Sequence, residues 1–133
     1  MKRYVPDGMP KSLTYPEGPL GAVLAGSARR YADRIALRDG ELTFTYGELY
    51  DSALRIAQAL RERGVRRGET VALHQPNSAW FTVTYFGILL AGAVVTPVNP
   101  ALRDQLEEAG TVAVFTHPST RATLTRPRSR ACG

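Results

Sequence analysis

The stretch that decides the fold is "TVALHQPNSAWFTVTYFGILLAGAVVTPVNP", Thr70–Pro100. It contains no charged side chain when His74 is neutral. Its β-branched start predicts a strand, residues 78–91 predict a helix, and its valine-rich end predicts a second strand. This succession predicts a βαβ unit in which the strands are parallel and covered on both faces.

The helix in this stretch has recognisable ends. Asn77 is the expected N-cap, because a side-chain oxygen at that position accepts a hydrogen bond from a free amide. Gly92 is the expected stop, because glycine adopts the left-handed conformation at little cost. A membrane span is the alternative, since about 20 mainly apolar residues cross a bilayer. Gly92 and Pro97 interrupt that pattern, so we expect a buried core helix and no membrane span.

The residues before this stretch predict a helix and a hairpin. "PLGAVLAGSARRYAD", residues 19–33, repeats apolar residues at helical spacing, and Pro19 suits the first turn. "RIALRDGELTFTY", residues 34–46, alternates as paired strands do. Asp39-Gly40 marks the turn between the two strands.

The clearest helix of the chain is "TYGELYDSALRIAQALRERG", residues 45–64. Thr45 and Glu48 have the spacing of a capping box, in which each side chain accepts from the other residue's backbone amide. One apolar stripe follows along the helix. Gly64 provides the left-handed stop.

The end of the chain completes the expected organisation. Residues 103–110 predict a short helix, and residues 111–116 predict a last strand. Strands that alternate with helices indicate an α/β fold, with βαβ units and a mostly parallel sheet. We expect an irregular leader at 1–18, a folded body at 19–116 and a basic, disordered tail at 117–133, because the tail has few large apolar residues.

The net charge of +5 is concentrated in the tail. The tail holds four arginines and no acid, which gives +4, whereas the other residues hold 13 basic and 12 acidic groups, which gives +1. The near-neutral body argues against a specific nucleic-acid partner. The one cysteine, Cys132, has no partner for an internal disulfide, which favours a cytoplasmic location.

The residues that most reactions need are absent from the folded body. Neither a phosphate-binding loop nor a dinucleotide fingerprint occurs. The only lysines, Lys2 and Lys11, lie in the leader. His74, His117 and Cys132 do not have the spacing of a metal site. We therefore expect no catalytic, no cofactor-binding and no metal-binding residue.

The remaining charged and polar candidates have structural explanations. His74 lies on a predicted buried strand and is expected to be a hydrogen-bonded structural histidine. Glu107 and Glu108 are adjacent on a short helix and predict a solvated surface. Asp51 and Arg55 have the spacing of a surface ion pair on a helix.

The ordered set of motifs resembles a known family. "TYGEL", the helix that ends in "GV", "RGETVAL", "PNS", the helix that ends in "AGAV", and "PVNP" follow one another at a characteristic spacing. The set resembles the N-terminal part of the adenylate-forming enzymes, which include acyl-CoA synthetases, the adenylation domains of peptide synthetases, and luciferases. The resemblance covers Pro19 to Phe115, and "PVNP" favours the acyl-CoA synthetases.

The resemblance implies the N-terminal, incomplete part of that family's fold. The complete enzymes join a carboxylate to ATP, release pyrophosphate, and pass the acyl group to a thiol, so ATP, Mg²⁺ and CoA are implied for the full-length family. Their phosphate loop, adenine site, ribose-binding aspartate and catalytic lysine lie downstream and have no counterpart here. No cofactor is therefore expected in this fragment.

Three functions remain open from the sequence. The first is a truncated remnant of an acyl-CoA synthetase, inactive alone. The second is a non-catalytic binding or assembly module that presents a sheet edge to a partner or to a second copy. The third is one half of a split ligase, restored by a separately encoded remainder. After Phe115, a coding-frame shift, a degraded gene end and an evolved tail are all compatible with the residues.

Overall fold

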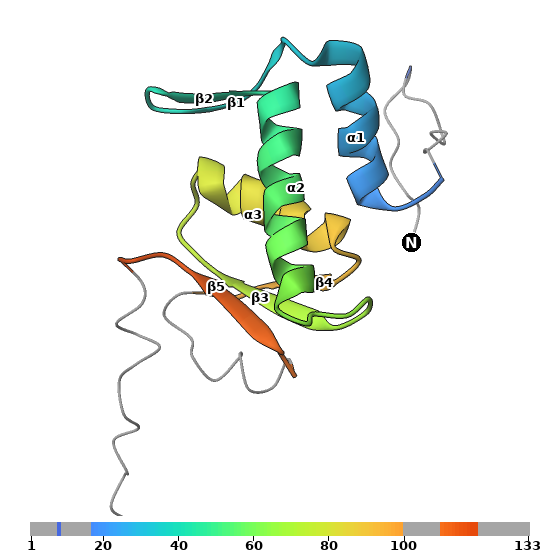
Figure 1. The fold of residues 1–133 in the computed structure, drawn as a ribbon. Helices are drawn as coiled ribbons and strands as arrows, with labels where there is room; N and C mark the ends of the chain where they lie inside the picture. Colours follow the sequence, from blue (N-terminus) through green and yellow to red (C-terminus); the bar gives the residue numbers. More distant parts are fainter. Residues whose placement is uncertain (1–7, 9–16, 100–109, 120–133) are drawn as a thin grey trace, which may run out of the picture.

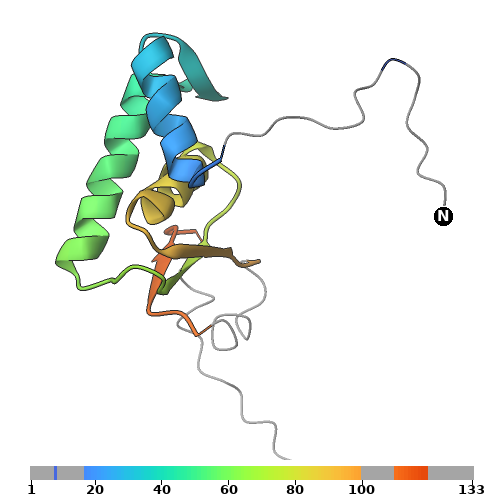
Figure 2. The same ribbon diagram turned by 90° about the vertical axis from the view of Figure 1, so that its right-hand side faces the viewer.

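The computed structural model of the chain describes Gly8, residues 17–99 and residues 110–119. Three helices lie on one side of a three-stranded sheet, and a two-stranded hairpin lies at the far end of the helices (Figure 1, Figure 2). The predicted short helix at 103–110 and most of the predicted leader and tail lie outside the described residues. The elements are α1 (Leu20–Tyr31), β1 (Ile35–Asp39), β2 (Leu42–Thr45), α2 (Tyr46–Glu62), β3 (Thr70–His74), α3 (Ala79–Leu90), β4 (Val94–Pro97) and β5 (Ala113–Thr116).

The first helix and the hairpin form where the sequence predicts them, with two local differences. Pro19 is the N-cap of α1 and not a first-turn residue. The hairpin pairs Asp39 with Leu42, so its two loop residues are Gly40 and Glu41, one position later than expected. Gly40 has φ +58°, and no other residue type in the described chain has positive φ. Glycine at the first of the two loop positions is typical of a type II′ turn, in which only that position needs a positive φ.

Both predicted signals at the ends of α2 are confirmed. Glu48 N–H donates to Thr45 Oγ1 at 3.1 Å, and Thr45 N–H donates to Glu48 Oε2 at 2.8 Å, which completes the capping box. At the other end Gly64 has φ +84°, and Val65 N–H donates to the Leu60 carbonyl at 3.0 Å. These two features stop the helix and place Val65 against the core.

The helix α3 begins one residue later than predicted. Ser78 is its N-cap, and the Ser78 Oγ accepts from Phe81 N–H at 3.3 Å, whereas Asn77 is exposed. Serine and asparagine are about equally good N-caps, so the sequence alone does not separate them. Gly92, with φ +80°, ends the helix as predicted.

The sheet has the order β4-β3-β5 and is parallel throughout. The central strand β3 is buried on both faces, as expected, because Val71, Ala72, Leu73 and His74 have no exposed surface. The expectation was wrong for β4: its Val94 is 49% exposed. The difference in burial follows from the position of each strand in the sheet: β3 is central, with a strand on each side, whereas β4 is an edge strand.

The core divides into two clusters on either side of α3. One lies between the helices and the sheet and includes Leu60, Val71, Leu73 and Ile88. The other lies between the helices and the hairpin and includes Phe44. The helices α2 and α3 therefore join the sheet to the hairpin through continuous apolar packing.

The length of α3 tests the alternative interpretation of this stretch as a membrane span. α3 has 12 residues, whereas a span needs about 20. No helix among the described residues is both long enough and apolar enough to cross a bilayer. The uncharged stretch from Thr70 owes its composition to burial around β3.

Candidate functional site

Polar side chains gather at the carboxyl ends of β3 and β5. In open α/β sheets, ligands bind beyond the carboxyl ends of strands, where successive connections diverge. The strand β3 is central, and β4 and β5 lie on opposite sides of it. His74 is the last residue of β3, and Thr116 is the last residue of β5. This end of the sheet is therefore the first candidate site.

His74 connects the two strands from inside the protein. It has no exposed surface, and its Nδ1 lies 3.2 Å from the Oγ1 of Thr116. The Thr116 hydroxyl also lies 3.5 Å from the backbone oxygen of His117. The expectation of a buried, hydrogen-bonded histidine is confirmed. A ring without exposed surface has no contact with solvent, which favours a structural role.

His117 and Ser119 form a second polar pair, just after β5. The Nδ1 of His117 lies 2.7 Å from the Ser119 Oγ, and the Ser119 backbone N–H donates to the same nitrogen at 3.1 Å. A serine hydroxyl beside a histidine is the arrangement of a nucleophile and its base. Here the lone pair of Nδ1 also receives a backbone N–H of the same turn. The pair is therefore explained as a turn that follows the strand.

Gln75 directly follows β3 and has an unusual side-chain oxygen. Its Oε1 is buried and has no hydrogen-bond partner among the residues that the structure describes. A buried polar atom without a partner costs about 1–3 kcal/mol, and such atoms are rare in folded proteins. The oxygen is suited to accept a hydrogen bond from a group brought to this end of the sheet. The described residues contain no group of three or more His, Cys, Asp or Glu side chains able to hold a metal ion.

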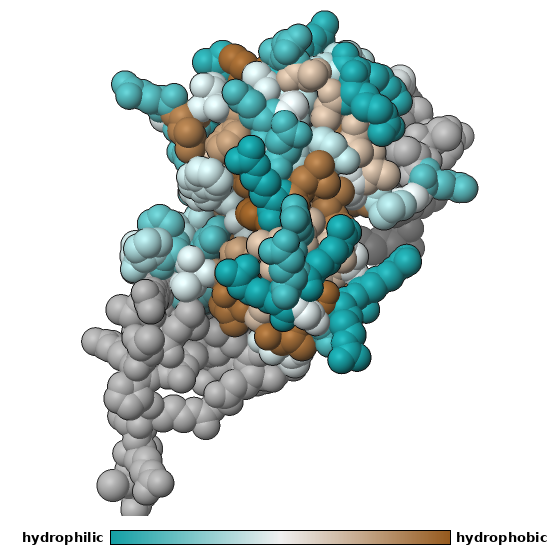
Figure 3. All heavy atoms as spheres, viewed as in Figure 1, coloured by the Kyte–Doolittle hydropathy of each residue, from teal (hydrophilic) through white to brown (hydrophobic). Residues whose placement is uncertain are grey.

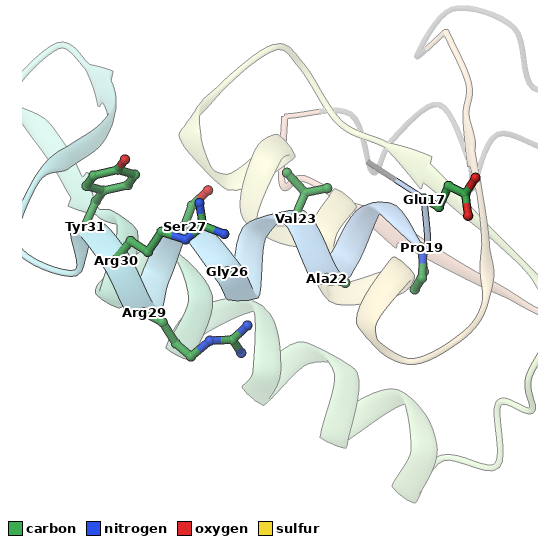
Figure 4. A pocket seen from close by; sticks show the side chains of 9 residues that line it. All are labelled: Glu17, Pro19, Ala22, Val23, Gly26, Ser27, Arg29, Arg30 and Tyr31. Atoms are coloured by element: carbon green, nitrogen blue, oxygen red, sulfur yellow. The ribbon is translucent and has the colours of Figure 1, made fainter. Parts of the chain in front are cut away.

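A shallow hollow of about 340 Å³ lies on the outer side of α1. Figure 4 shows its lining, in which Ala22 and Gly26 contribute little side chain. Arg29 and Arg30 leave the helix in different directions, so their guanidinium groups do not converge on one point. The described lining residues therefore provide neither a convergent polar set nor a deep apolar floor, which ligand sites generally combine.

A groove of about 400 Å³ lies between α2 and β5, and we call it the α2–β5 groove. Apolar side chains of both elements line the groove, and Arg55 and Arg63 lie at the two ends of the part that α2 forms. Figure 3 shows hydrophobic surface beside hydrophilic side chains over the lower half of α2. The lining residues are Arg55, Ile56, Ala59, Leu60, Arg63, Ala113, Val114 and Phe115.

The sequence interpretation gave Arg55, one of the two groove arginines, a structural role. Arg55 was expected to pair with Asp51, but the structure shows no ion pair between these two described residues. Arg63 donates from Nη1 to the Ala59 carbonyl at 3.3 Å, near the end of the helix. One signal for the groove is present in the sequence: Arg55, Ala59 and Arg63 are four residues apart and so share one face of α2. Their proximity to β5 depends on the fold.

The comparison with protein families identifies one match. The profile described as AMP-binding enzyme matches residues 24–132, most of the chain. The match continues beyond Phe115, where the sequence resemblance was expected to end, into the residues interpreted as a tail.

Relatives and solved structures agree with this match. The chain is 44% identical over 101 residues to "4-coumarate--CoA ligase-like 9" of Oryza sativa subsp. japonica, covering 74% of the chain and 17% of the relative. It is 30% identical over 116 residues to "Long-chain-fatty-acid--CoA ligase" of Bacillus subtilis (strain 168), covering 84% and 21%. The structure of the nonribosomal peptide synthetase FmoA3 (S1046A) matches with a TM-score of 0.79 and 33% identity, covering 87% and 13%.

These matches confirm the predicted fold class: an α/β unit from the N-terminal part of adenylate-forming enzymes, with a small and incomplete parallel sheet. The chain spans about a fifth of the length of the two curated relatives. The relatives include both CoA ligases and a peptide synthetase, so the comparison leaves the acid substrate open.

Proposed function

The chain belongs to the AMP-binding enzyme family, and we propose that it is the N-terminal section of an acid–thiol ligase of the acyl-CoA synthetase type. The observation that supports this proposal is the family match over residues 24–132 together with the two CoA-ligase relatives. In this proposal the section is a scaffold, and it has no ligase activity by itself. A cytoplasmic location is part of the proposal and rests on the single cysteine.

The parent reaction joins a carboxylate to ATP, releases pyrophosphate, and then forms a thioester. ATP, Mg²⁺ and CoA are implied for the complete enzymes. The described residues do not fit these groups: they include no lysine, no glycine-rich phosphate loop and no cluster of acidic side chains for a divalent ion. We therefore derive no catalytic step through this section, and assign it support of the fold around the site.

An ATP–pyrophosphate exchange assay tests the proposal. The purified chain is incubated with ATP, labelled pyrophosphate and one acid at a time: 4-coumaric acid, a long-chain fatty acid, or an amino acid. We expect no exchange above a blank without protein. The intact Bacillus subtilis relative serves as the positive control with the fatty acid. Exchange that rises in proportion to the chain's concentration would overturn the proposal of an inactive section.

A second candidate function is an assembly module or one half of a split ligase. The open sheet edge and the α2–β5 groove favour it, because both present unpaired or apolar surface to a partner. Co-expression with the remaining part of a ligase separates the possibilities. Restored exchange identifies a split enzyme, co-purification without exchange identifies an assembly module, and an inert monomer that captures nothing supports the scaffold remnant.

A further inference from the structure

The two outer strands of the sheet differ in how their open edges are protected. In β4, the N–H groups of Val94 and Val98 donate to carbonyls on the β3 side. By alternation, Val95 and Pro97 direct their backbone groups to the open edge of β4. Pro97 has no N–H to offer there, and proline is a common device against strand addition. The edge of β4 is therefore a poor acceptor for a further strand.

The edge of β5 has no such protection among the described residues. The Glu69 and Leu73 carbonyls accept bonds from β4, so the alternate residues of β3 direct their backbone groups to β5. Ala72 is in register with Val114, and the partners of Ala72 in a parallel pair are the residues on either side of Val114. The N–H and C=O of Val114 consequently face the open edge, ready to pair with another strand.

The α2–β5 groove lies directly beside this open edge. A strand added to β5 would place every second side chain on the helix side, in line with Ala113 and Phe115. Those side chains would meet the apolar lining formed by Ile56 and Leu60 of α2. The groove and the edge thus form one continuous surface, which recognises backbone through the edge and side chains through the groove.

The ends of the groove carry positive charge. Arg55 and Arg63 both line it, and none of the described lining residues is acidic. Two carboxylates of α2 are near these arginines in the sequence, and neither lines the groove: Asp51 lies one turn before Arg55, and Glu62 accepts from Gln58 Nε2 at 2.9 Å. Arg63 uses one N–H on the Ala59 carbonyl, which leaves most of the five donors of a guanidinium for a carboxylate. The groove therefore favours a segment with acidic side chains.

The distance between the arginines suggests a specific pattern. Eight residues of helix separate Arg55 from Arg63, which corresponds to about 12 Å along the axis. Four residues of strand span about 13 Å. A strand with acidic side chains at positions i and i+4, and an apolar one at i+2, directs all three to the helix side. The two acids then reach the arginines while the apolar residue covers the floor of the groove.

We propose that the open edge of β5 and the α2–β5 groove receive a β-strand from the remaining part of the ligase, with an acid-x-apolar-x-acid pattern facing α2. The inference rests on the proposed function, because the occupant is a segment of the same enzyme. The chain spans only 17% and 21% of the two curated relatives, so a complete ligase has ample polypeptide to supply the strand.

Two other occupants fit the surface less well. Residues 117–133 carry four arginines and no acid, so the chain's own end is repelled by Arg55 and Arg63. A second copy that added its own residues 111–116 would bring no acid either, since that segment is uncharged. Edge-to-edge pairing of two copies through β5 would also bring four arginines together.

Binding of short labelled peptides to the full 133-residue chain tests the proposal. The probe is the nonapeptide acetyl-Thr-Thr-Glu-Thr-Val-Thr-Glu-Thr-Thr-amide, followed by fluorescence anisotropy. We expect it to bind about tenfold more tightly than the same peptide with lysine at both glutamate positions, as two exposed ion pairs would produce. In a strand added parallel to β5, the residues whose side chains face α2 direct their N–H groups to the edge of β5, so N-methylation of the central valine amide should abolish binding.

Charge reversal assigns the binding to the groove. The double variant Arg55→Glu/Arg63→Glu should invert the preference, so that the lysine peptide binds more tightly. The control Arg29→Glu/Arg38→Glu makes the same change of net charge on exposed residues of α1 and β1 and should retain the original preference. Arg55→Gln/Arg63→Gln, which should show no preference, provides a milder variant if the reversal disturbs folding.

Three results of the peptide experiments would overturn the inference. They are equal binding of the acidic and lysine peptides, loss of preference in the control variant, and binding that survives N-methylation. A β5-mediated dimer that disappears in the Arg55→Glu/Arg63→Glu variant would assign the edge to a second copy and would also overturn it. None of these readouts uses ATP or pyrophosphate. Failure here is therefore distinguishable from failure of the exchange assay.

Discussion

Asp39 is a single side chain that joins two elements far apart in the sequence. It is the last residue of β1, and its Oδ2 accepts from the backbone N–H of Ala79 at 2.9 Å. Ala79 is the first residue of α3, where amides lack partners within the helix and negative charge is favourable. Ser78 provides the second acceptor at the same helix end. The hairpin therefore helps to cap the central buried helix.

Removal of this acceptor should have a measurable cost. Asp39→Ala is expected to lower the free energy of unfolding by about 1 kcal/mol, the usual effect of losing a helix-cap side chain. Asp39→Asn keeps an acceptor and should lose less. Asp33→Ala is the matched control, because Asp33 is exposed and no hydrogen bond to it is seen among the described residues. Urea unfolding of the three variants gives the comparison, and equal losses for Asp39→Ala and Asp33→Ala would refute the cap.

Residue-scale prediction from sequence succeeded where the chemistry is local. Thr45 and Glu48 are three residues apart, and their capping box depends on nothing outside that turn. It failed by one residue at α3, because Asn77 and Ser78 are both good caps and the choice depends on packing. The contribution of Asp39 could not be predicted, since its partner is 40 residues away.

At the scale of elements, the contact between α2 and α3 depends on Gly87. A methyl group at Gly87 would lie 2.5 Å from Ile56 Cγ2 and 3.1 Å from the Ala53 carbonyl oxygen. Both distances are shorter than ordinary van der Waals contact. The absence of a side chain at Gly87 therefore lets the two helices approach closely and bury the apolar residues between them.

Gly87→Ala should consequently destabilise the chain, although alanine is the better helix former. We expect a loss of about 1–3 kcal/mol, typical of overpacking a tight core. Gly26→Ala on α1 is the control: the nearest heavy atom to its added methyl is Arg29 Nη2 at 3.9 Å. That substitution should be neutral or stabilise by up to about 1 kcal/mol.

Thermal unfolding followed by circular dichroism measures both glycine variants. If the clash with Ile56 is the cause, the loss in Gly87→Ala should be smaller when Ile56→Ala is already present. Additive effects of Gly87→Ala and Ile56→Ala would contradict the proposed contact. A similar loss in Gly26→Ala would show that glycine matters for another reason.

Elements were more predictable from the sequence than the surfaces they form together. Each described helix and strand was expected, because periodicity and end signals are local. The α2–β5 groove was not expected, since Arg55 and Phe115 are 60 positions apart and meet only after the sheet has the order β4-β3-β5. The open edge likewise depends on strand order, which periodicity does not give.

At the scale of the whole molecule, the sheet has one face against the helices and one face turned away from them. Val71 and Leu73 of β3 face the helices and belong to the core. Val94 and Val112 flank Thr70 of β3, on the opposite face, and are 49% and 53% exposed. Val114 lies on the same face and is 38% exposed. We call these three valines the outer valine patch; exposed apolar patches of this kind promote association.

The outer valine patch should make the isolated chain self-associate. Static light scattering over a range of concentrations should show an apparent mass that rises above that of a monomer. Val94→Lys/Val112→Lys should reduce this rise, because lysine on a sheet surface opposes association. It should leave the unfolding midpoint nearly unchanged, since both side chains are about half exposed. Val23→Lys, at a 46% exposed position of α1, is the control and should not reduce association. A compact monomer at every concentration would contradict the prediction, and would mean that the section is stable without the rest of the ligase.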